Sequence, residues 1–149
     1  MQKYTQLMAA YGAAEGIDFK FGGSVANTLH AHRVIQHFQE AEGSKVADGV
    51  VRSLYRQYFE EERHPSSDET LIRAAEEAGV GEAEARRVVE DRSEGLGETK
   101  MLLRDAVSNQ VDSVPRIVLE GKRRDIELVG AKSVEEYVAA LQKIIKESS

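Results

Sequence analysis

The chain has 149 residues, a formal net charge of −6 and no cysteine. This length is sufficient for one domain that buries an apolar core without disulfides. The lack of thiols excludes disulfide exchange by the chain itself, because a thiolate is the attacking group in that reaction. The acidic excess, without a long Lys/Arg cluster, argues against nucleic acid or an anionic membrane as the main partner.

No targeting or membrane segment is visible in the sequence. The first residues contain no apolar signal region. Apolar residues nowhere run together for about 18 positions, the length that a membrane-spanning helix needs. We therefore expect a cytoplasmic protein without a membrane span.

Helical periodicity dominates residues 3–108 and predicts a layer of amphipathic helices. Gly16 ends the first helix, and Asn27 or Thr28 can cap the second through a side-chain oxygen. The predicted helices lie, in chain order, at residues 4–15, 29–42, 46–61 and 67–79, with two more around 85–89 and 101–106.

Two details concern particular side chains of this layer. Ser66, with Glu69 three residues later, has the spacing of a capping box at the start of the fourth helix. In the second helix, the apolar stripe leaves Arg33 away from its centre and His32 near its edge.

The pattern changes to β-structure after Pro115. Short β-branched runs at 117–119 and 126–129 flank a polar stretch and predict a β-hairpin. Ser133 and Glu136 then have the spacing of a capping box for a last helix up to about residue 146.

Together these elements predict one domain, residues 1–149, of mainly α class with a small β-hairpin (α+β). Its helical layer covers about 3–108, and the proline, the hairpin and the last helix cover about 114–146. Two strands alone are marginally stable, and their free edges invite pairing. We therefore expect a homodimer in which the hairpins or adjoining helices of two copies cover one another.

Four segments form a pattern through their order and spacing. They are residues 15–19 (EGIDF), 27–33 (NTLHAHR), 111–115 (VDSVP) and 130–131 (GA). The pattern resembles the DsbA-like thioredoxin superfamily, in particular the branch of FrnE-type oxidoreductases and 2-hydroxychromene-2-carboxylate isomerases. The resemblance runs nearly end to end and implies a truncated DsbA-like thioredoxin fold with its helical insert.

The chain also departs from that family. Family members begin with a strand, a helix bearing Cys-x-x-Cys or Ser, and a second strand, and we expect this sequence to start after all three. Gln110 and Ser113 stand where the family usually has glycines. The resemblance implies a cis bond between Val114 and Pro115, where relatives pair the preceding backbone with a thiol peptide or glutathione.

The resemblance implies a ligand cleft between the helical insert and the proline loop. His32 falls at a cleft-lining position, and an imidazole can exchange a proton near neutral pH. We therefore predict His32 as the catalytic acid or base, with a hydrogen bond inside the helical layer as the alternative. Asn27 and Thr28 are candidate ligand contacts as well as caps, and the backbone of Val114 and Pro115 would orient the ligand.

A metal site is not predicted. His30, His32 and His37 lie on one helix, at spacings of two, five and seven. Chelation from a single helix prefers a spacing of four. We interpret these residues as surface or cleft-edge histidines.

The expected function is binding of a small organic molecule, or action on it as a cofactor-independent isomerase or cyclase. The first alternative is a noncatalytic protein that pairs with itself or with a full-length relative through its hairpin edge. The second is a relative of glutathione-dependent isomerases and transferases, with glutathione as its ligand. Apart from that case, we expect no cofactor.

Overall fold

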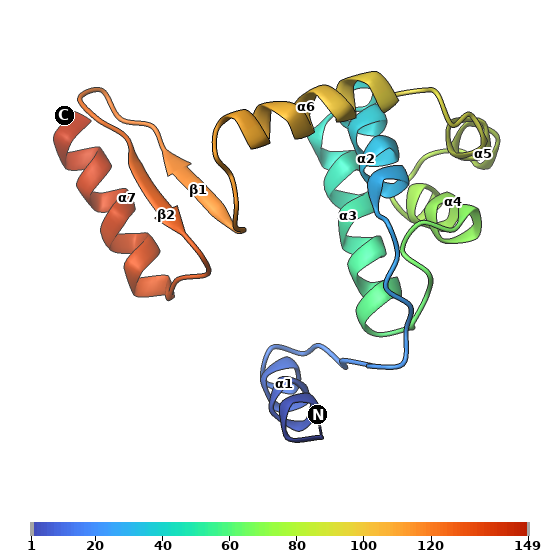
Figure 1. Cartoon of the computed structure of the whole chain (residues 1–149), viewed down its shortest axis with the longest axis horizontal. Coiled ribbons are helices and arrows are strands. Elements are labelled where there is room, and N and C mark those ends of the chain that lie inside the picture. Colours follow the sequence, from blue (N-terminus) through green and yellow to red (C-terminus); the bar gives the residue numbers. More distant parts are fainter. Residues whose placement is uncertain (1, 149) are drawn as a thin grey trace. The chain divides into compact units, whose positions relative to one another are not determined.

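This computed structural model describes residues 2–148 of the chain. Seven helices and two strands, joined by loops, lie within them (Figure 1). They are α1 (Gln2–Ala14), α2 (Leu29–Ala41), α3 (Ser44–Phe59), α4 (Asp68–Glu77), α5 (Glu82–Glu90), α6 (Leu96–Ser108), β1 (Arg116–Leu119), β2 (Ile126–Val129) and α7 (Val134–Ser148). The predicted class, mainly α with one small hairpin, is confirmed. Within residues 2–148, no helix has both the length and the apolar character needed to cross a bilayer. The chain divides into two compact units, Met1–Met101 and Leu102–Ser149.

The core of the first unit lies among α2, α3, α4 and α5. Each of these helices packs on the next, and α5 returns to α2. Val34 and Phe38 on α2, and Val50 and Leu54 on α3, are buried there, because positions four apart share one face of a helix. Burial of one such side chain contributes about 2 kcal/mol. The same periodicity had predicted these helices from the sequence.

One charged residue, Arg33, lies inside this core with only 1 % of its surface exposed. Its guanidinium donates to the carbonyl oxygens of Val88 (2.9 Å), Val89 (3.0 Å) and Glu94 (2.8 Å). The last carbonyls of a helix have no partners within it, and a cation there also complements the helix dipole. Arg33 thus satisfies the end of α5, a role that its place away from the apolar stripe did not indicate.

The start of α4 differs by one residue from the predicted capping box. The N-cap is Ser67, whose hydroxyl accepts the N–H of Thr70 at 3.3 Å. Ser66 instead donates its hydroxyl to the carbonyl oxygen of Asn27 at 2.9 Å. Ser66 therefore ties the start of α4 to the segment before α2.

Residues 17–28 join α1 to α2 as an irregular segment. The N–H of Lys20 donates to the carbonyl oxygen of Phe59 at 2.7 Å. The rings of Phe19 and Phe59 meet edge to face, with centroids 5.5 Å apart. These contacts hold the segment at the end of α3.

In the second unit, β1 and β2 form an antiparallel hairpin that pairs Arg116 with Val129 and Leu119 with Ile126. Alternate residues of a strand share a face, and α7 packs against β1. The half-buried residues, on the face that α7 covers, are Ile117, Leu119, Ile126 and Leu128.

The start of α7 confirms the second capping box. The N–H of Ser133 donates to Oε2 of Glu136 at 2.9 Å, and the N–H of Glu136 donates to Oγ of Ser133 at 3.2 Å. The backbone and hydroxyl hydrogen bonds with Ser133 lower the pKa of the Glu136 carboxyl. This helix start therefore depends on residues only three apart.

Candidate functional site

A pocket of about 420 Å³ opens on the first unit between α2 and α3. Four residues from each side line it at the spacing i, i+3, i+4, i+7, which is one face of a helix. They are Thr28, Ala31, His32 and Ile35 at α2, and Val51, Leu54, Tyr55 and Tyr58 on α3. The wall is completed by Val25, Ala26, Phe59 and Pro65.

His32 is an exposed residue on the α2 side of this pocket. Its backbone N–H donates to the carbonyl oxygen of Thr28 at 2.9 Å, which closes the first turn of the helix. Its ring has no bonding partner among residues 2–148. Both ring nitrogens are therefore available to a ligand, and the alternative hydrogen bond inside the helical layer is not formed in this part of the chain.

Two tyrosines bring phenol hydroxyls to the same pocket. Tyr58 is half-buried, and its ring packs edge to face on Phe59 with centroids 4.9 Å apart. Tyr55 is exposed and lies one turn earlier on α3. The sequence favours core or dimer packing for both, because they lie on an apolar stripe where tyrosines commonly pack. The available sequence signal is their spacing along α3, which is the same i, i+3, i+4, i+7 spacing as that of the pocket residues at α2.

Asn27 and Thr28 take different places at the start of α2. Oδ1 of Asn27 accepts the N–H of Leu29 at 2.8 Å, so this side chain works as a cap. Thr28 occupies the N-cap position without a side-chain hydrogen bond and lines the pocket. Asn27 lies instead at a neighbouring depression beside His30. Thr28 and His32 thus share a pocket that Asn27 does not line.

The ring of His30 forms a hydrogen bond through Nδ1, and its Nε2 lies near a carboxylate. Nδ1 lies 3.0 Å from Nη2 of Arg33 and accepts its hydrogen, and Nε2 lies 3.5 Å from Oδ1 of Asp68. Burial, followed by the positive charges of Arg33 and Arg92, lowers the pKa of His30. A neutral ring suits this place, because protonated Nδ1 could not accept from Arg33.

The histidines of α2 lie in three separate environments. Nδ1 of His37 is 3.4 Å from Oε1 of Glu94, whereas His30 faces Asp68 and His32 faces the pocket. Among residues 2–148, no three His, Asp or Glu side chains come together in an arrangement that would hold a metal ion. The histidines of this helix therefore act as individual groups.

The proline loop belongs to the second unit. The bond between Val114 and Pro115 is cis, as the resemblance implies. Val114 is 82 % exposed, and the carbonyl oxygen of Pro115 accepts the N–H of Gly130 at 2.8 Å. The loop is therefore anchored on the hairpin side and open at Val114.

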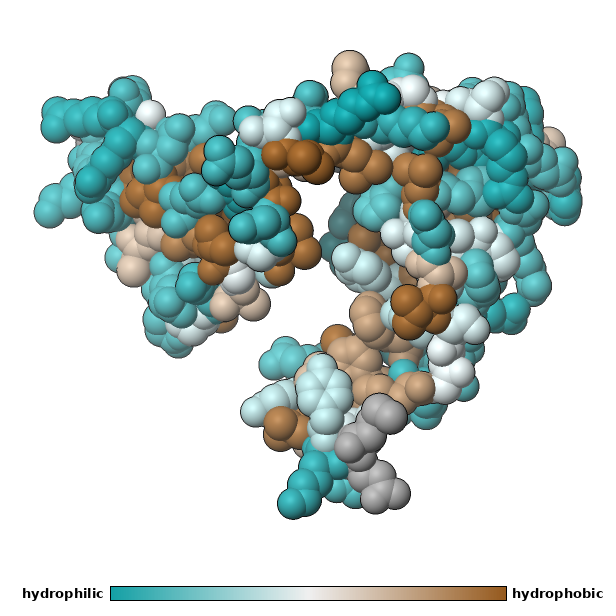
Figure 2. Space-filling model, in the orientation of Figure 1, coloured by the Kyte–Doolittle hydropathy of each residue, from teal (hydrophilic) through white to brown (hydrophobic). Residues whose placement is uncertain are grey.

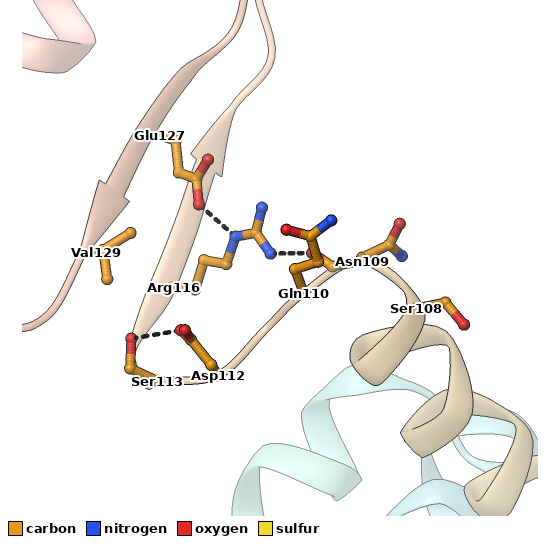
Figure 3. Close-up of a pocket in the computed structure, with 8 residues that line it drawn as sticks. All are labelled: Ser108, Asn109, Gln110, Asp112, Ser113, Arg116, Glu127 and Val129. Carbon is orange, nitrogen blue, oxygen red and sulfur yellow. Dashed lines mark hydrogen bonds and ion pairs between the residues drawn. The ribbon is translucent and has the colours of Figure 1, made fainter.

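A polar depression of about 520 Å³ lies beside this loop (Figure 3). Nη1 of Arg116 donates to the carbonyl oxygen of Asn109 at 2.6 Å, and Nε forms an ion pair with Glu127. Ser113 donates to Oδ1 of Asp112 at 3.3 Å. Arg116 and Glu127 meet because the hairpin register puts them on one face of neighbouring strands, a contact that the sequence alone did not reveal.

Gln110 occupies the left-handed region, with φ of +55°, just after α6. Its N–H donates to the carbonyl oxygen of Val107 at 3.0 Å, and the N–H of Val111 donates to that of Ala106 at 3.0 Å. These two bonds make a Schellman motif, whose left-handed residue is usually glycine. The backbone here thus has the conformation that glycine favours, although this chain places glutamine there.

The predicted site residues fall into the two units. Asn27, Thr28 and His32 belong to the first, and Val114 and Pro115 belong to the second. The two groups of residues therefore lie in different units, and the common cleft expected from the sequence stays a prediction.

Comparisons with known proteins give one family. The model of the DSBA-like thioredoxin domain matches residues 1–142. A solved structure, that of a proposed protein disulfide isomerase from Nitrosomonas europaea, is similar with a TM-score of 0.77 at 15 % identity, over 99 % of this chain and 76 % of that chain. At this identity the likeness shows the fold alone. Among curated proteins, none matches the sequence.

Proposed function

This chain belongs to the DSBA-like thioredoxin domain family, and on that basis we propose that it binds a small organic molecule between α2 and α3 and isomerises or cyclises it. The chain contains no cysteine, so it cannot carry out dithiol–disulfide exchange by itself. The observation that carries the proposal is the pocket of about 420 Å³ in which His32 stands in a mainly apolar wall.

The size and lining of the pocket suit a small, partly aromatic ligand. Sites for small molecules commonly measure about 300–1,000 Å³ and combine apolar walls with a few polar groups. Here Ile35, Val51 and Leu54 supply apolar surface, and Tyr55 and Tyr58 supply ring faces. An apolar body with one or two polar substituents matches this lining.

The polar groups suit proton transfer. As a base, His32 would take a proton from a carbon next to a carbonyl group of the ligand and return it to another carbon. The hydroxyl of Tyr58 would donate a hydrogen bond to the carbonyl oxygen while negative charge develops there. Such an isomerisation gains and loses no atoms and needs no cofactor. The resemblance to the branch that contains 2-hydroxychromene-2-carboxylate isomerases supports this reaction class.

The remaining predicted contacts have secondary parts in the proposal. Asn27 would act on the ligand only indirectly, because its side-chain oxygen caps α2. The exposed backbone at Val114 and Pro115 would be a second contact for the ligand, supported by its exposure and by the resemblance. Glutathione remains a candidate ligand of that loop.

A noncatalytic interaction protein is the second candidate. Large apolar side chains are exposed on the first unit near its N-terminal part, among them Tyr4, Leu7, Tyr11 and Phe21. Surfaces of this kind often mark contacts with other proteins. In this case the pocket would receive a partner's side chain in place of a free ligand.

A binding experiment tests the pocket. A set of aromatic and aliphatic carboxylic acids, including 2-hydroxychromene-2-carboxylate, would be screened by ligand-observed NMR with the full chain. Val51→Trp fills the pocket, whereas Arg52→Trp adds the same side chain to an exposed neighbouring position of α3. We expect Val51→Trp to abolish binding of any hit and Arg52→Trp to keep it. Equal binding by both variants, or no hit for the unmodified chain, would refute the proposal.

A second experiment tests His32 itself. For any hit that is converted, His32→Gln keeps a polar side chain but removes the titratable group. We expect turnover to fall by about 10²-fold or more, with binding nearly unchanged. Unchanged turnover would remove His32 from the mechanism and leave a binding role for the pocket.

A further inference from the structure

A second hollow, of about 440 Å³, lies beside the pocket between α2 and α3, in the same first unit. We call it the α1 hollow. Three residues, Val25, Tyr58 and Phe59, line both the pocket and this hollow. The two spaces are therefore neighbours that share one wall. The other walls of the α1 hollow belong to α1 and to the irregular segment before α2, at Tyr4, Met8, Phe19, Lys20, Phe21 and Gly23.

Aromatic rings form a continuous series from the pocket to the α1 hollow. The ring centroid of Phe59 lies 5.8 Å from that of Tyr55 and 4.9 Å from that of Tyr58, which both line the pocket. It also lies 5.5 Å from that of Phe19, which is 6.3 Å from that of Phe21. Rings at such distances are in contact, and Phe19 and Phe21 line the α1 hollow. An apolar ligand can thus follow aromatic surface from one space into the other.

Close packing on α1 holds the wall at Phe19. A Cβ atom at Gly12 would lie 2.4 Å from Cδ2 of Phe19, so α1 approaches this ring at a position where glycine leaves room. The N–H of Ile17 donates to the carbonyl oxygen of Gly12 at 2.8 Å. The N–H of Lys20 donates to the carbonyl oxygen of Phe59 at 2.7 Å. These contacts tie α1, the irregular segment and the end of α3 to one another around the hollow.

The charges around the α1 hollow disfavour an anion there. Among the residues that line it, Lys20 is the charged one, and its ammonium group donates to Oδ2 of Asp18 at 2.6 Å. The hydrogen bond and the charge of Asp18, with smaller effects of Glu62 and Glu60, raise the pKa of Lys20. Three carboxylates thus surround one ammonium group, and they would repel an anionic group of a ligand. The part of a ligand that fits this hollow is therefore uncharged.

We propose that the ligand of the pocket has two parts, an aryl ketone head between α2 and α3 and an uncharged apolar arm that passes Phe59 into the α1 hollow. This inference rests on the proposed function and defines the class of its substrate. The head meets His32 and Tyr58, whereas the arm meets Met8 and Phe21. Figure 2 shows apolar surface between the lower end of α3 and α1, along the course of the arm.

Two ketones that share one head test the arm by calorimetric titration of the full chain. Acetophenone supplies the head alone, and 4-butylacetophenone adds an apolar arm to it. Full burial of one methylene group strengthens binding about fourfold. We therefore expect 4-butylacetophenone to bind about tenfold more tightly than acetophenone, or better still, even with the arm only partly buried.

A matched pair of variants assigns this gain to the α1 hollow. Met8→Trp reduces the room in the hollow, whereas Gln6→Trp adds the same side chain at an exposed position of α1 that does not line it. We expect Met8→Trp to bind the two ketones within about twofold of each other, with its affinity for acetophenone unchanged. Gln6→Trp should keep the full gain. The same gain in both variants would overturn the proposal.

The methionine methyl groups report directly where the arm lies. The sequence has methionines at positions 1, 8 and 101, so selective carbon-13 labelling of their methyl groups gives few NMR signals, and Met8→Leu identifies that of Met8. We expect 4-butylacetophenone to shift the Met8 signal and to show a nuclear Overhauser effect from its butyl group to this methyl group. Acetophenone should do neither. Met101, which lines neither space, is the internal control.

The outcomes separate this inference from the proposed function. If neither ketone binds, the two-part ligand is wrong, and the acid screen with Val51→Trp still decides whether the pocket binds a small molecule. If acetophenone binds but the butyl arm adds no affinity, or leaves the Met8 signal unmoved, the arm is wrong while the pocket stands. A Met8 signal that moves with protein concentration alone would place a second copy of the chain in the hollow and would likewise overturn the inference.

Discussion

The two units of the chain bury their side chains to very different extents. In the first unit four helices contribute buried apolar residues, and even Arg33 and Gln57 are buried with hydrogen-bond partners. Among residues 102–147, Ala140 is the one buried residue. Since apolar burial is the main driving force of folding, the first unit has a core of its own, whereas the described residues of the second unit bury little apolar surface.

This difference bears on the proposed pocket. A well-packed helical core can hold a pocket in a constant shape, because its walls are positions of buried helix faces. The hairpin and α7 instead leave apolar side chains such as Val118 and Leu141 exposed. The following substitutions test the contrast, from the largest expected effect to the smallest.

Removal of a buried ring should have the largest effect. Phe38→Ala is expected to lower the free energy of unfolding by about 3–5 kcal/mol, through lost burial and a cavity in the core. Val107→Ala, at an exposed site of the second unit, should change it by less than about 0.5 kcal/mol. Urea unfolding followed by circular dichroism measures both. Equal losses would break the contrast between the units.

Removal of the buried guanidinium should have the next largest effect. Arg33→Met leaves the carbonyl groups of Val88, Val89 and Glu94 without this donor, at a cost of about 2–3 kcal/mol. Arg52→Met is the surface control, since Arg52 only pairs with Asp48 one turn away, and it should cost less than about 0.5 kcal/mol. If Arg33→Met were as mild as the control, the buried polar network would not stabilise the first unit.

A stabilising substitution is expected in the second unit. Gln110→Gly removes the cost of a side chain at positive φ and should raise the free energy of unfolding by about 1 kcal/mol. Arg104→Gly, inside α6, should lower it by about 0.8 kcal/mol. Thermal unfolding of the two variants therefore shifts in opposite directions. A loss of stability in Gln110→Gly would contradict the Schellman geometry.

The smallest expected effect is a pH dependence. The folded-state pKa of His30 lies below its ordinary value of 6.5, because of burial and of Arg33 and Arg92. The unfolded state then binds more protons in acid, so the stability from the neutral ring is complete above about pH 6.5 and declines as the pH falls through the folded-state pKa. His30→Asn should flatten this decline in urea midpoints. An equally steep decline in His30→Asn would assign it to other groups.

The local elements of the fold could be predicted from the sequence. Apolar spacing predicted the helices and the hairpin, and Ser133 with Glu136 predicted the cap of α7. Each of these features depends on residues within one or two turns of each other. The capping box at α4 was misplaced by one residue, because Ser66 has a tertiary partner, Asn27, that local spacing does not include.

The candidate site was predictable only in part. His32 was selected through the family resemblance, and the structure adds the pocket that it lines and the tyrosines opposite. Those tyrosines lie on α3. The spacing of residues along α3 does not indicate which side of α2 this helix packs against. Arg116 and Glu127 likewise meet only through the register of the hairpin.

The sequence by itself determined the lack of thiol groups, the helical layer and the hairpin, because composition and local periodicity are properties of the chain alone. Only the tertiary structure decided that Arg33 is buried, that His30 is hydrogen-bonded to Arg33, and that His32 lines a pocket without a ring partner among residues 2–148. Those features depend on contacts between residues far apart in sequence, and burial and hydrogen bonding take effect only when the fold brings such residues together.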